Sequence, residues 1–306
     1  MRKMKDFLSI NDCTVEQLNE LLELSAELKS LYKGGGRDLC LAGKVLAMLF
    51  EKPSLRTRIS FHVAMTDLGG GVIYVKPEDI GGIGKREPIK DMGRVLSRYV
   101  DVIMARTFEH STITGLAEHA SVPVINALTD WSHPCQAMAD VLTIKEHLGR
   151  IEGVKLAYVG DGNNVARSLA IAAGKLGMKM IIAAPAGYEL DAETIEKANE
   201  MSPGSIVQTN DPKAAVSDAD VIYTDTWVSM GQEDEKARRV ADFEGFQVNM
   251  ELVNCAPAGV KIMHCLPAKR GYEITDEVTE MPGSIIFDQA ENRLHFQRAL
   301  LKKLVS

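Results

Sequence analysis

The chain has 306 residues, of which 45% are hydrophobic, and this length allows two domains with substantial cores. Its formal net charge is −7, from 35 basic and 42 acidic residues, which argues against a nucleic-acid partner. No stretch approaches the roughly 18 consecutive apolar residues of a membrane span, and no signal-peptide core follows the basic residues at the start. The five cysteines are scattered without a CxxC pair, so we expect reduced thiols in a soluble, cytoplasmic protein.

The first half of the chain alternates between apolar runs and helical patterns. An amphipathic helix should extend from a capping box at residues 14–17 to about Tyr32, where three glycines end it. The expected strands then lie at 45–50, 72–75, 101–105 and 122–126, and the expected helices near 57–68, 88–99, 111–120 and 134–148. This alternation predicts an α/β fold in which a doubly wound parallel sheet carries helices on both faces.

A glycine-bounded seam at residues 149–153 separates the second half, in which the alternation restarts. A helix should begin at Asn164 and a final helix should cover 291–305, while the expected strands lie at 155–159, 178–184, 205–208, 220–224, 260–265 and 284–287. We therefore expect two doubly wound domains, residues 1–148 and 149–289, with a C-terminal helix of about 290–306 packed back on the first. In such sheets ligands bind beyond the carboxyl ends of the strands.

A dense polar cluster, Ser54-Leu55-Arg56-Thr57-Arg58, directly follows the first of these strands. Pro53 ends the strand and Ser54 is a good N-cap, so main-chain N–H groups, hydroxyls and guanidiniums should converge at a helix start. Such a cluster suits a phosphate or another dianion. Arg106 ends another strand and is a candidate for a further cation around the same anion.

Another cluster, His133-Pro134-Cys135-Gln136, opens a helix with Pro134 in its first turn. His133 and Gln136 lie one turn apart, so His133 could polarise a ligand carbonyl while Gln136 pairs with an amide.

The segment Gly160-Asp161-Gly162-Asn163-Asn164 invites a dinucleotide-binding interpretation. Val165 occupies the position of the third glycine, however, and would obstruct close packing against a pyrophosphate. Asn163 and Asn164 are better suited to bind a carboxylate or an amine, so we expect no nucleotide cofactor.

Candidate reactive side chains also lie at the ends of two more expected strands. Asp225, at the start of Asp-Thr-Trp-Val-Ser-Met-Gly, could hold a substrate ammonium group. In His264-Cys265-Leu266-Pro267 the thiol could contact an amine, and because no second pair of metal ligands is nearby in sequence we expect no metal. Clusters in both halves of the chain indicate an enzyme that brings an anionic donor to a second substrate.

Taken together, S-x-R-T-R, H-P-x-Q, D-x-W-x-S-M-G and H-C-L-P, in this order, resemble the aspartate/ornithine transcarbamoylase family, and within it the ornithine branch. The resemblance extends from about Asp6 to Leu304. It implies an enzyme that transfers the carbamoyl group of carbamoyl phosphate to the side-chain amine of L-ornithine, giving L-citrulline and phosphate in arginine biosynthesis. It also implies no cofactor and a homotrimer, or an assembly of trimers.

The resemblance further implies roles for single residues. Ornithine would be bound by Asn164, Asp225, Ser229 and Met230. Carbamoyl phosphate would be bound by Ser54, Leu55, Arg56, Thr57, Arg106, His133, Gln136, Cys265, Leu266 and, on a strand-to-helix turn, Arg293. The catalytic residues would be Arg56, Arg106, His133, Asp225 and Cys265, of which Asp225 and Cys265 are the candidates to take the proton of the attacking amine.

Two positions depart from the family pattern. Leu55 stands where Thr is usual, and Gly82 stands where a loop usually supplies Gln to a neighbouring subunit's site. These departures support one alternative, a non-catalytic paralogue that binds carbamoyl phosphate. Another alternative is a carbamoyltransferase for a different amine such as putrescine. Asp225 and Ser229 favour an amino-acid substrate instead, because putrescine has no α-carboxylate to recognise.

Overall fold

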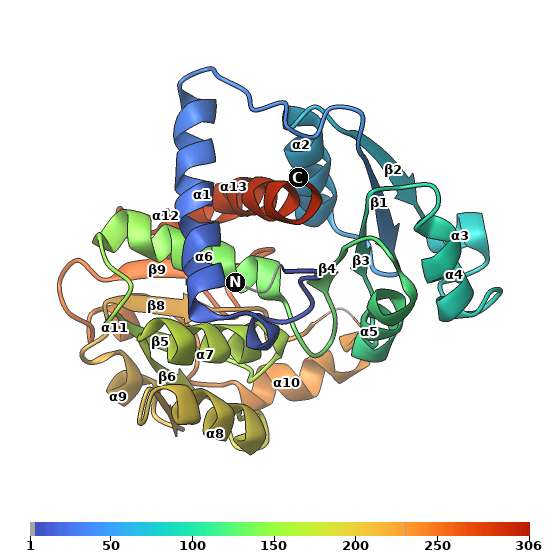
Figure 1. Ribbon diagram of the computed structural model, residues 1–306. Helices are drawn as coiled ribbons and strands as arrows, with labels where there is room; N and C mark the ends of the chain where they lie inside the picture. Colours follow the sequence, from blue (N-terminus) through green and yellow to red (C-terminus); the bar gives the residue numbers. More distant parts are fainter. Residues whose placement is uncertain (1–3, 230) are drawn as a thin grey trace. The chain divides into compact units, whose positions relative to one another are not determined.

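The computed structural model describes residues 4–229 and 231–306. By its internal contacts the chain divides into two compact units (Figure 1). Unit 1 contains the residues up to Leu142 together with Glu291–Ser306, and unit 2 contains Thr143–Ala290. Each unit is built on its own parallel sheet, as the alternation of strands and helices predicts.

Unit 1 contains a four-stranded parallel sheet with the order β2-β1-β3-β4. Its strands are β1 (Val45–Phe50), β2 (Gly71–Val75), β3 (Val102–Arg106) and β4 (Val124–Leu128). All five residues of β3 are buried, as a strand between two neighbours in a covered sheet should be. The predicted strand positions agree with these bounds to within two residues.

Helices surround this sheet. Residues from α4 and α5, such as Met92 and Leu116, pack with Ala47 and Ile103 of the sheet in one apolar cluster. The helical elements assigned wholly or partly to unit 1 are η1 (Ile10–Asp12), α1 (Val15–Lys33), α2 (Leu55–Asp67), α3 (Pro77–Ile80), α4 (Ile89–Leu96), α5 (His110–His119), α6 (Pro134–Leu148) and α13 (Ile286–Val305).

The first and last helices of unit 1 lie side by side (Figure 1). Helix α1 begins with the predicted capping box, in which Thr14 and Gln17 each accept the other's main-chain N–H. Salt bridges and hydrogen bonds then join α1 to α13, among them Lys303 to Glu20 at 2.7 Å and Lys29 to Asn292 at 2.8 Å. The end of the chain is thereby held on unit 1.

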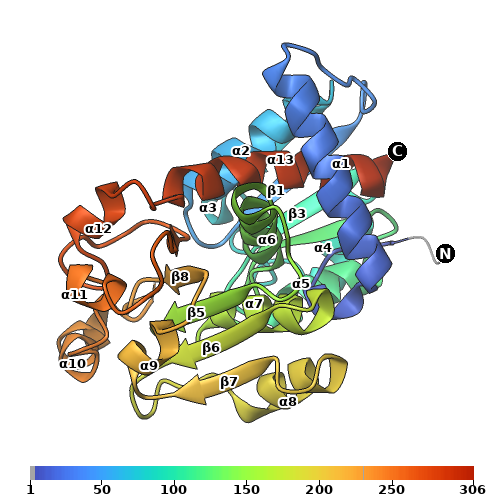
Figure 2. The same cartoon turned by 90° about the vertical axis from the view of Figure 1, so that its left-hand side faces the viewer.

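Unit 2 contains a five-stranded parallel sheet with the order β7-β6-β5-β8-β9. Figure 2 shows the arrows of β5, β6 and β7 pointing the same way. The strands are β5 (Lys155–Val159), β6 (Lys179–Ala183), β7 (Ile206–Thr209), β8 (Val221–Thr224) and β9 (Lys261–His264). The helical elements are α7 (Asn164–Leu176), α8 (Ala192–Met201), α9 (Pro212–Val216), η2 (Glu233–Glu235), α10 (Lys236–Asp242), α11 (Met250–Val253) and α12 (Asp276–Glu280).

One predicted strand, at 284–287, is wrong. Ser284 forms only a single bridge with Ile262, and helix α13 already begins at Ile286. The short apolar run was misleading because Ile285 and Ile286 are buried at the start of α13. The periodicity of so few residues cannot distinguish a strand from the first turn of a helix. Arg293 therefore lies inside α13 and not on a strand-to-helix turn. No helix among the described residues is long and apolar enough to cross a membrane.

Candidate active site

The cation-rich cluster of unit 1 forms where three neighbouring parallel strands end. Strands β1, β3 and β4 lie side by side, so their carboxyl ends meet at one edge of the sheet. Ser54 caps α2 as predicted, and its hydroxyl oxygen accepts the N–H of Thr57 at 3.3 Å. Arg106 ends β3 and is 9% exposed, and His133 lies directly before α6.

Arg293 of α13 connects two of these elements. Its Nη2 donates to Thr57 Oγ1 at 2.7 Å and its Nη1 donates to Gln136 Oε1 at 3.0 Å. Gln136 is oriented further by donating from Nε2 to Asp140 Oδ1 at 2.8 Å. All of these side chains are buried, so their positions are well defined before any substrate arrives. A carbonyl oxygen has two lone pairs, and Gln136 Oε1 can therefore accept a second N–H from a ligand.

His133 reports how strongly positive this cluster is. Burial lowers the pKa of His133 well below its usual range, and the nearby charges of Arg293, Arg106 and Arg56 lower it further. The imidazole is therefore neutral at neutral pH. It can donate one hydrogen bond to a ligand carbonyl, while the three guanidiniums provide the positive charge that attracts an anion.

The side chains of two residues in the Ser-Leu-Arg-Thr-Arg motif have surroundings other than the cations near His133. The guanidinium of Arg58 lies 4.1 Å from the centre of the Tyr74 ring, away from the side chain of Arg56, because positions i and i+2 do not share a helix face. Leu55 is 74% exposed. Only its main-chain N–H, at the first helical position, is suited to contact an anion.

Lys52 was missed by the sequence analysis. It is 5% exposed, donates a hydrogen bond to Asp130, and places its ammonium group 4.2 Å from the centre of the Phe108 ring. The adjacent Glu51 accepts the N–H of Phe108 at 2.9 Å, and Asp130 N donates to Phe108 O at 2.9 Å. Glu51 and Lys52 thereby connect the loops that follow β1, β3 and β4. A charged residue within two positions of the end of a buried strand was the available signal, and a charge at a strand end is also what singled out Arg106.

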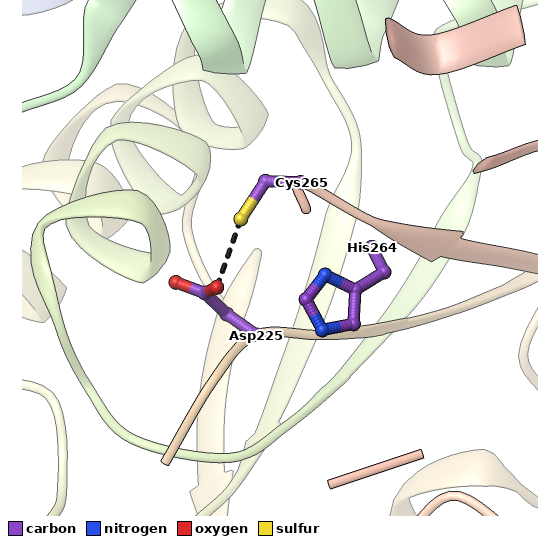
Figure 3. A group of neighbouring side chains, drawn as sticks. All are labelled: Asp225, His264 and Cys265. Atoms are coloured by element: carbon purple, nitrogen blue, oxygen red, sulfur yellow. Dashed lines mark hydrogen bonds between the residues drawn. The ribbon is translucent and has the colours of Figure 1, made fainter. Parts of the chain in front are cut away.

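In unit 2 the side chain of Asp225 is the centre of a second cluster. It follows β8, which lies between β5 and β9 in the sheet. Its Oδ1 accepts the Cys265 thiol at 2.9 Å and the N–H of Thr226 at 2.7 Å, and its Oδ2 accepts from Asn163 Nδ2 at 2.8 Å. Figure 3 shows the thiol of Cys265 directed at this carboxylate. The two residues expected to take the proton of the amine are thus in direct contact.

The two asparagines of unit 2 have different positions. Asn163 is the N-cap of α7, and its Oδ1 accepts from the N–H groups of Val165 and Ala166 at 2.9 and 3.1 Å. Asn163 thus orients Asp225 through Nδ2 while Asn164 is the first helical residue. The helix start at Asn164 was predicted from the sequence, but the contact of Asn163 with Asp225, 62 positions away, leaves no local pattern.

The predicted residue Ser229 lies on the loop after β8, and Gly162 of the dinucleotide-like segment lies at the turn after β5. Ser229 donates its N–H to Gln232 Oε1 at 3.0 Å, whereas Met230 lies outside the described residues. Gly162 has a structural explanation, since a Cβ there would come within 2.3 Å of the main-chain nitrogen of Leu190. Close chain packing therefore accounts for this glycine without a nucleotide.

Asp225, His264 and Cys265 also meet the distance requirement of a metal site, with ligand atoms within 4.8 Å of one another. Both nitrogens of His264 are engaged, however. Nδ1 is 2.9 Å from the N–H of Leu266, and Nε2 is 3.1 Å from Glu273 Oε1. His264 can bind a metal only by breaking one of these hydrogen bonds.

The cation-rich edge of one sheet and the carboxylate–thiol edge of the other are those of an enzyme that handles an anionic substrate and an amine. Residues 5–146 match the family described as aspartate/ornithine carbamoyltransferase, carbamoyl-P binding domain. Residues 152–304 match the Asp/Orn binding domain of the same description. The chain belongs to the aspartate/ornithine carbamoyltransferase family.

Individual relatives agree with this family. The ornithine carbamoyltransferase of Methanosarcina mazei is 51% identical over 98% of this chain and 99% of that protein. The anabolic ornithine carbamoyltransferase of Pyrococcus furiosus is 52% identical over 97% of this chain and 95% of that protein. The solved structure of the Pyrococcus furiosus enzyme has a TM-score of 0.96 at 51% identity, covering 99% of this chain and 97% of that one. That of the Thermus thermophilus enzyme has a TM-score of 0.90 at 44% identity, with 99% coverage of both chains.

Proposed function

We propose that the protein transfers the carbamoyl group of carbamoyl phosphate to the side-chain amine of L-ornithine, giving L-citrulline and phosphate. The relatives that bear the name ornithine carbamoyltransferase support this reaction, and the anabolic one supports a role in arginine biosynthesis. The observation that carries the proposal is the buried junction of Arg293 with Thr57 and Gln136 in unit 1. A junction of this kind is suited to hold a small, planar, anionic carbonyl compound.

Unit 1 is the proposed carbamoyl-phosphate-binding domain. The first-turn N–H groups of α2 and the guanidiniums of Arg56 and Arg106 bind the phosphate, with Ser54 and Thr57 beside them. His133, Gln136 and Arg293 bind the carbamoyl group. Each hydrogen bond to a charged group contributes roughly 1.5–3 kcal/mol. Because Arg106, His133 and Arg293 are buried and already oriented, they stabilise the tetrahedral intermediate and the departing phosphate with little reorganisation.

Unit 2 is the proposed ornithine-binding domain. Asp225 binds the side-chain ammonium, and Asn164 and Ser229, with Met230 by family resemblance, bind the amino-acid end. The amine must lose a proton before its nitrogen attacks the carbonyl carbon. With a lysine-like pKa near ~10.4, this costs roughly 4.6 kcal/mol at pH 7. Asp225 and Cys265 are hydrogen-bonded at 2.9 Å and offer a route for that proton. The bond from the carbonyl carbon to the phosphate oxygen then breaks, and phosphate leaves.

Leu55 and Gly82 favour the alternative of a non-catalytic paralogue only weakly. The exposed side chain of Leu55 lies outside the buried junction, so replacing the usual Thr leaves the main-chain contact intact. Gly82 is in a left-handed conformation at φ 90°, where glycine is favoured over other residues.

A steady-state assay with carbamoyl phosphate and three amines tests the proposal. We expect citrulline formation with ornithine, and little turnover with putrescine or with ornithine acetylated on its α-amine. A higher turnover with putrescine than with ornithine would identify the protein as a putrescine carbamoyltransferase. Saturable binding of carbamoyl phosphate without turnover of any amine would instead support the non-catalytic paralogue.

The protein is also proposed to act as a homotrimer, or an assembly of trimers, in the cytoplasm. Exposed apolar side chains on α2, on the edge strand β2 and after α4 support self-association through unit 1; they are Leu55, Ile59, Ile73 and Tyr99. The five cysteines are free thiols, which suits a reducing compartment. Sedimentation equilibrium should give three times the chain mass of 33.5 kDa or a multiple of it, and a monomer would refute the assembly.

A further inference from the structure

His264 and Glu273 form a fully buried pair beside the cluster of unit 2. Both side chains have an exposure of 0%. His264 is the last residue of β9, and Glu273 lies in the segment between β9 and α12. The imidazole contacts Glu273 on one side and the main chain of Leu266 on the other, at 3.1 and 2.9 Å.

These two contacts determine where the ring proton of His264 lies. The N–H of Leu266 can only donate, so Nδ1 must be the acceptor and carries no proton. The single proton of the neutral ring is then on Nε2, which donates it to Glu273 Oε1. A doubly protonated ring would place an N–H against the N–H of Leu266. The pair is therefore a hydrogen bond from a neutral histidine in one tautomer, and not an ion pair.

The same pair fixes the chain that carries Cys265. Glu273 Oε1 also accepts the N–H of Lys269 at 2.5 Å, which closes the loop at its far end. Leu266 adopts φ 59°, a left-handed conformation that costs a non-glycine residue about 1–2 kcal/mol. A hydrogen bond to its N–H helps to maintain that conformation.

We propose that His264 is a positioning residue, which holds Leu266 and thereby the thiol of Cys265 against Asp225, and that Glu273 selects the tautomer required. The proposal rests on the proposed function, in which Asp225 and Cys265 receive the proton of the ornithine amine. His264 itself takes no part in proton transfer, because each of its nitrogens already has a partner in the protein.

Two matched substitutions separate the two contacts. The amide oxygen of Asn reaches the place of Nδ1, so His264→Asn keeps the acceptor for Leu266. The amide nitrogen of Gln reaches the place of Nε2, so His264→Gln keeps the donor to Glu273 and loses that acceptor. We expect kcat/KM for ornithine to fall at least tenfold in His264→Gln and less than threefold in His264→Asn. The KM for carbamoyl phosphate should stay within twofold in both, because its proposed binding residues on unit 1 are unchanged.

A second pair of variants tests the role of Glu273. Glu273→Gln retains an acceptor for both Nε2–H and the N–H of Lys269, and should keep kcat/KM for ornithine within threefold of wild type. Glu273→Leu removes the acceptor and should resemble His264→Gln. Equal losses in the two His264 variants, or in the two Glu273 variants, would overturn the proposal. So would a rise in the KM for carbamoyl phosphate as large as that for ornithine.

The tautomer can be measured without any variant having to fold or any activity having to exist. Histidine ¹⁵N NMR of the intact protein at about pH 7 should show a protonated Nε2 and an unprotonated Nδ1 for His264. The opposite tautomer, or a doubly protonated ring, would refute the proposal even in an active enzyme. A wild-type protein that makes no citrulline but shows the expected tautomer would instead refute the proposed function.

Discussion

At the scale of single residues, the surroundings of a side chain decide its chemistry more than its type does. His133, directly before α6, and His264, at the end of β9, are both buried. The charges of three guanidiniums act on His133, whereas His264 is hydrogen-bonded to Glu273 on one side and to the N–H of Leu266 on the other. Arg56 and Arg58 belong to one motif, yet only Arg56 lies with the cations near His133. These contrasts provide matched pairs of variants.

Replacing Arg56 by Ala should lower citrulline formation by at least ~100-fold, because a charged donor to the leaving phosphate is lost from a preorganised site. Arg58→Ala is the control. It removes a guanidinium of the same motif that lies on Tyr74, and turnover should stay within about threefold of wild type. Near-normal turnover of Arg56→Ala in a steady-state assay would remove Arg56 from the phosphate site.

His133 makes the stability of the fold depend on pH. Its pKa in the folded protein lies well below the ordinary value of 6.5, so above that pH the ring is neutral both folded and unfolded. Below pH 6.5 only the unfolded chain takes up the proton, and the free energy of unfolding should fall by up to about 1.4 kcal/mol per pH unit.

Urea unfolding of wild type and His133→Gln between about pH 7.5 and 5.5 measures this effect. The variant should lose less stability on acidification, while His110 and His295, whose pKa values are also lowered by burial, act equally in both proteins. Identical pH slopes would show that His133 is readily protonated in the folded state.

At the scale of elements, the site depends on loops that are held by residues outside the motifs. Glu51 and Lys52 join the loops after three strands, and α13 carries Arg293 to α2 and α6. Asn163 caps α7 through Oδ1 and also donates a hydrogen bond from Nδ2 to Asp225. Such residues hold catalytic groups in place and so affect binding indirectly.

Lys52→Met should raise the KM for carbamoyl phosphate about tenfold, equivalent to about 1.4 kcal/mol, because the loops carrying Arg106 and His133 lose their common tie. Lys44→Met is the matched control. Lys44 precedes the other end of β1 and pairs with Asp101 at 2.9 Å, away from the cluster. Equal KM values in the two variants would show that Lys52 has no special role.

At the scale of the whole molecule, each unit supplies one kind of chemistry and the reaction requires both. The cations of unit 1 suit an anionic donor, and the carboxylate and thiol of unit 2 suit an amine. The rate should therefore depend on pH through the amine, since the guanidiniums stay charged and His133 stays neutral above neutral pH.

We expect kcat/KM for ornithine to rise between about pH 7 and 9, as the fraction of neutral amine increases. Calorimetric binding of a bisubstrate mimic to wild type and to Asp225→Asn over the same range provides the control for substrate affinity. A flat rate profile would show that deprotonation of the amine does not limit the reaction.

Local sequence patterns suffice to predict the alternation of strands and helices, the class of fold and the motifs that mark the family. These are local properties: buried strands, caps and polar residues at strand ends leave patterns within a few neighbouring positions. The capping box of α1 and the bounds of α6 are examples, since both were predicted to the residue.

Contacts between residues of distant segments, by contrast, are visible in the fold and not in the sequence. Arg293 reaches Thr57 across 236 positions of the chain, and Lys52, Asn163 and Glu273 were not recognised for their contacts by any pattern. The strand expected at 284–287 is wrong because a short buried segment has the same composition in a strand and in a helix, and the fold alone distinguishes the two. Hydrogen bonds between side chains far apart in sequence leave no periodic signal, and the folded chain alone brings them together.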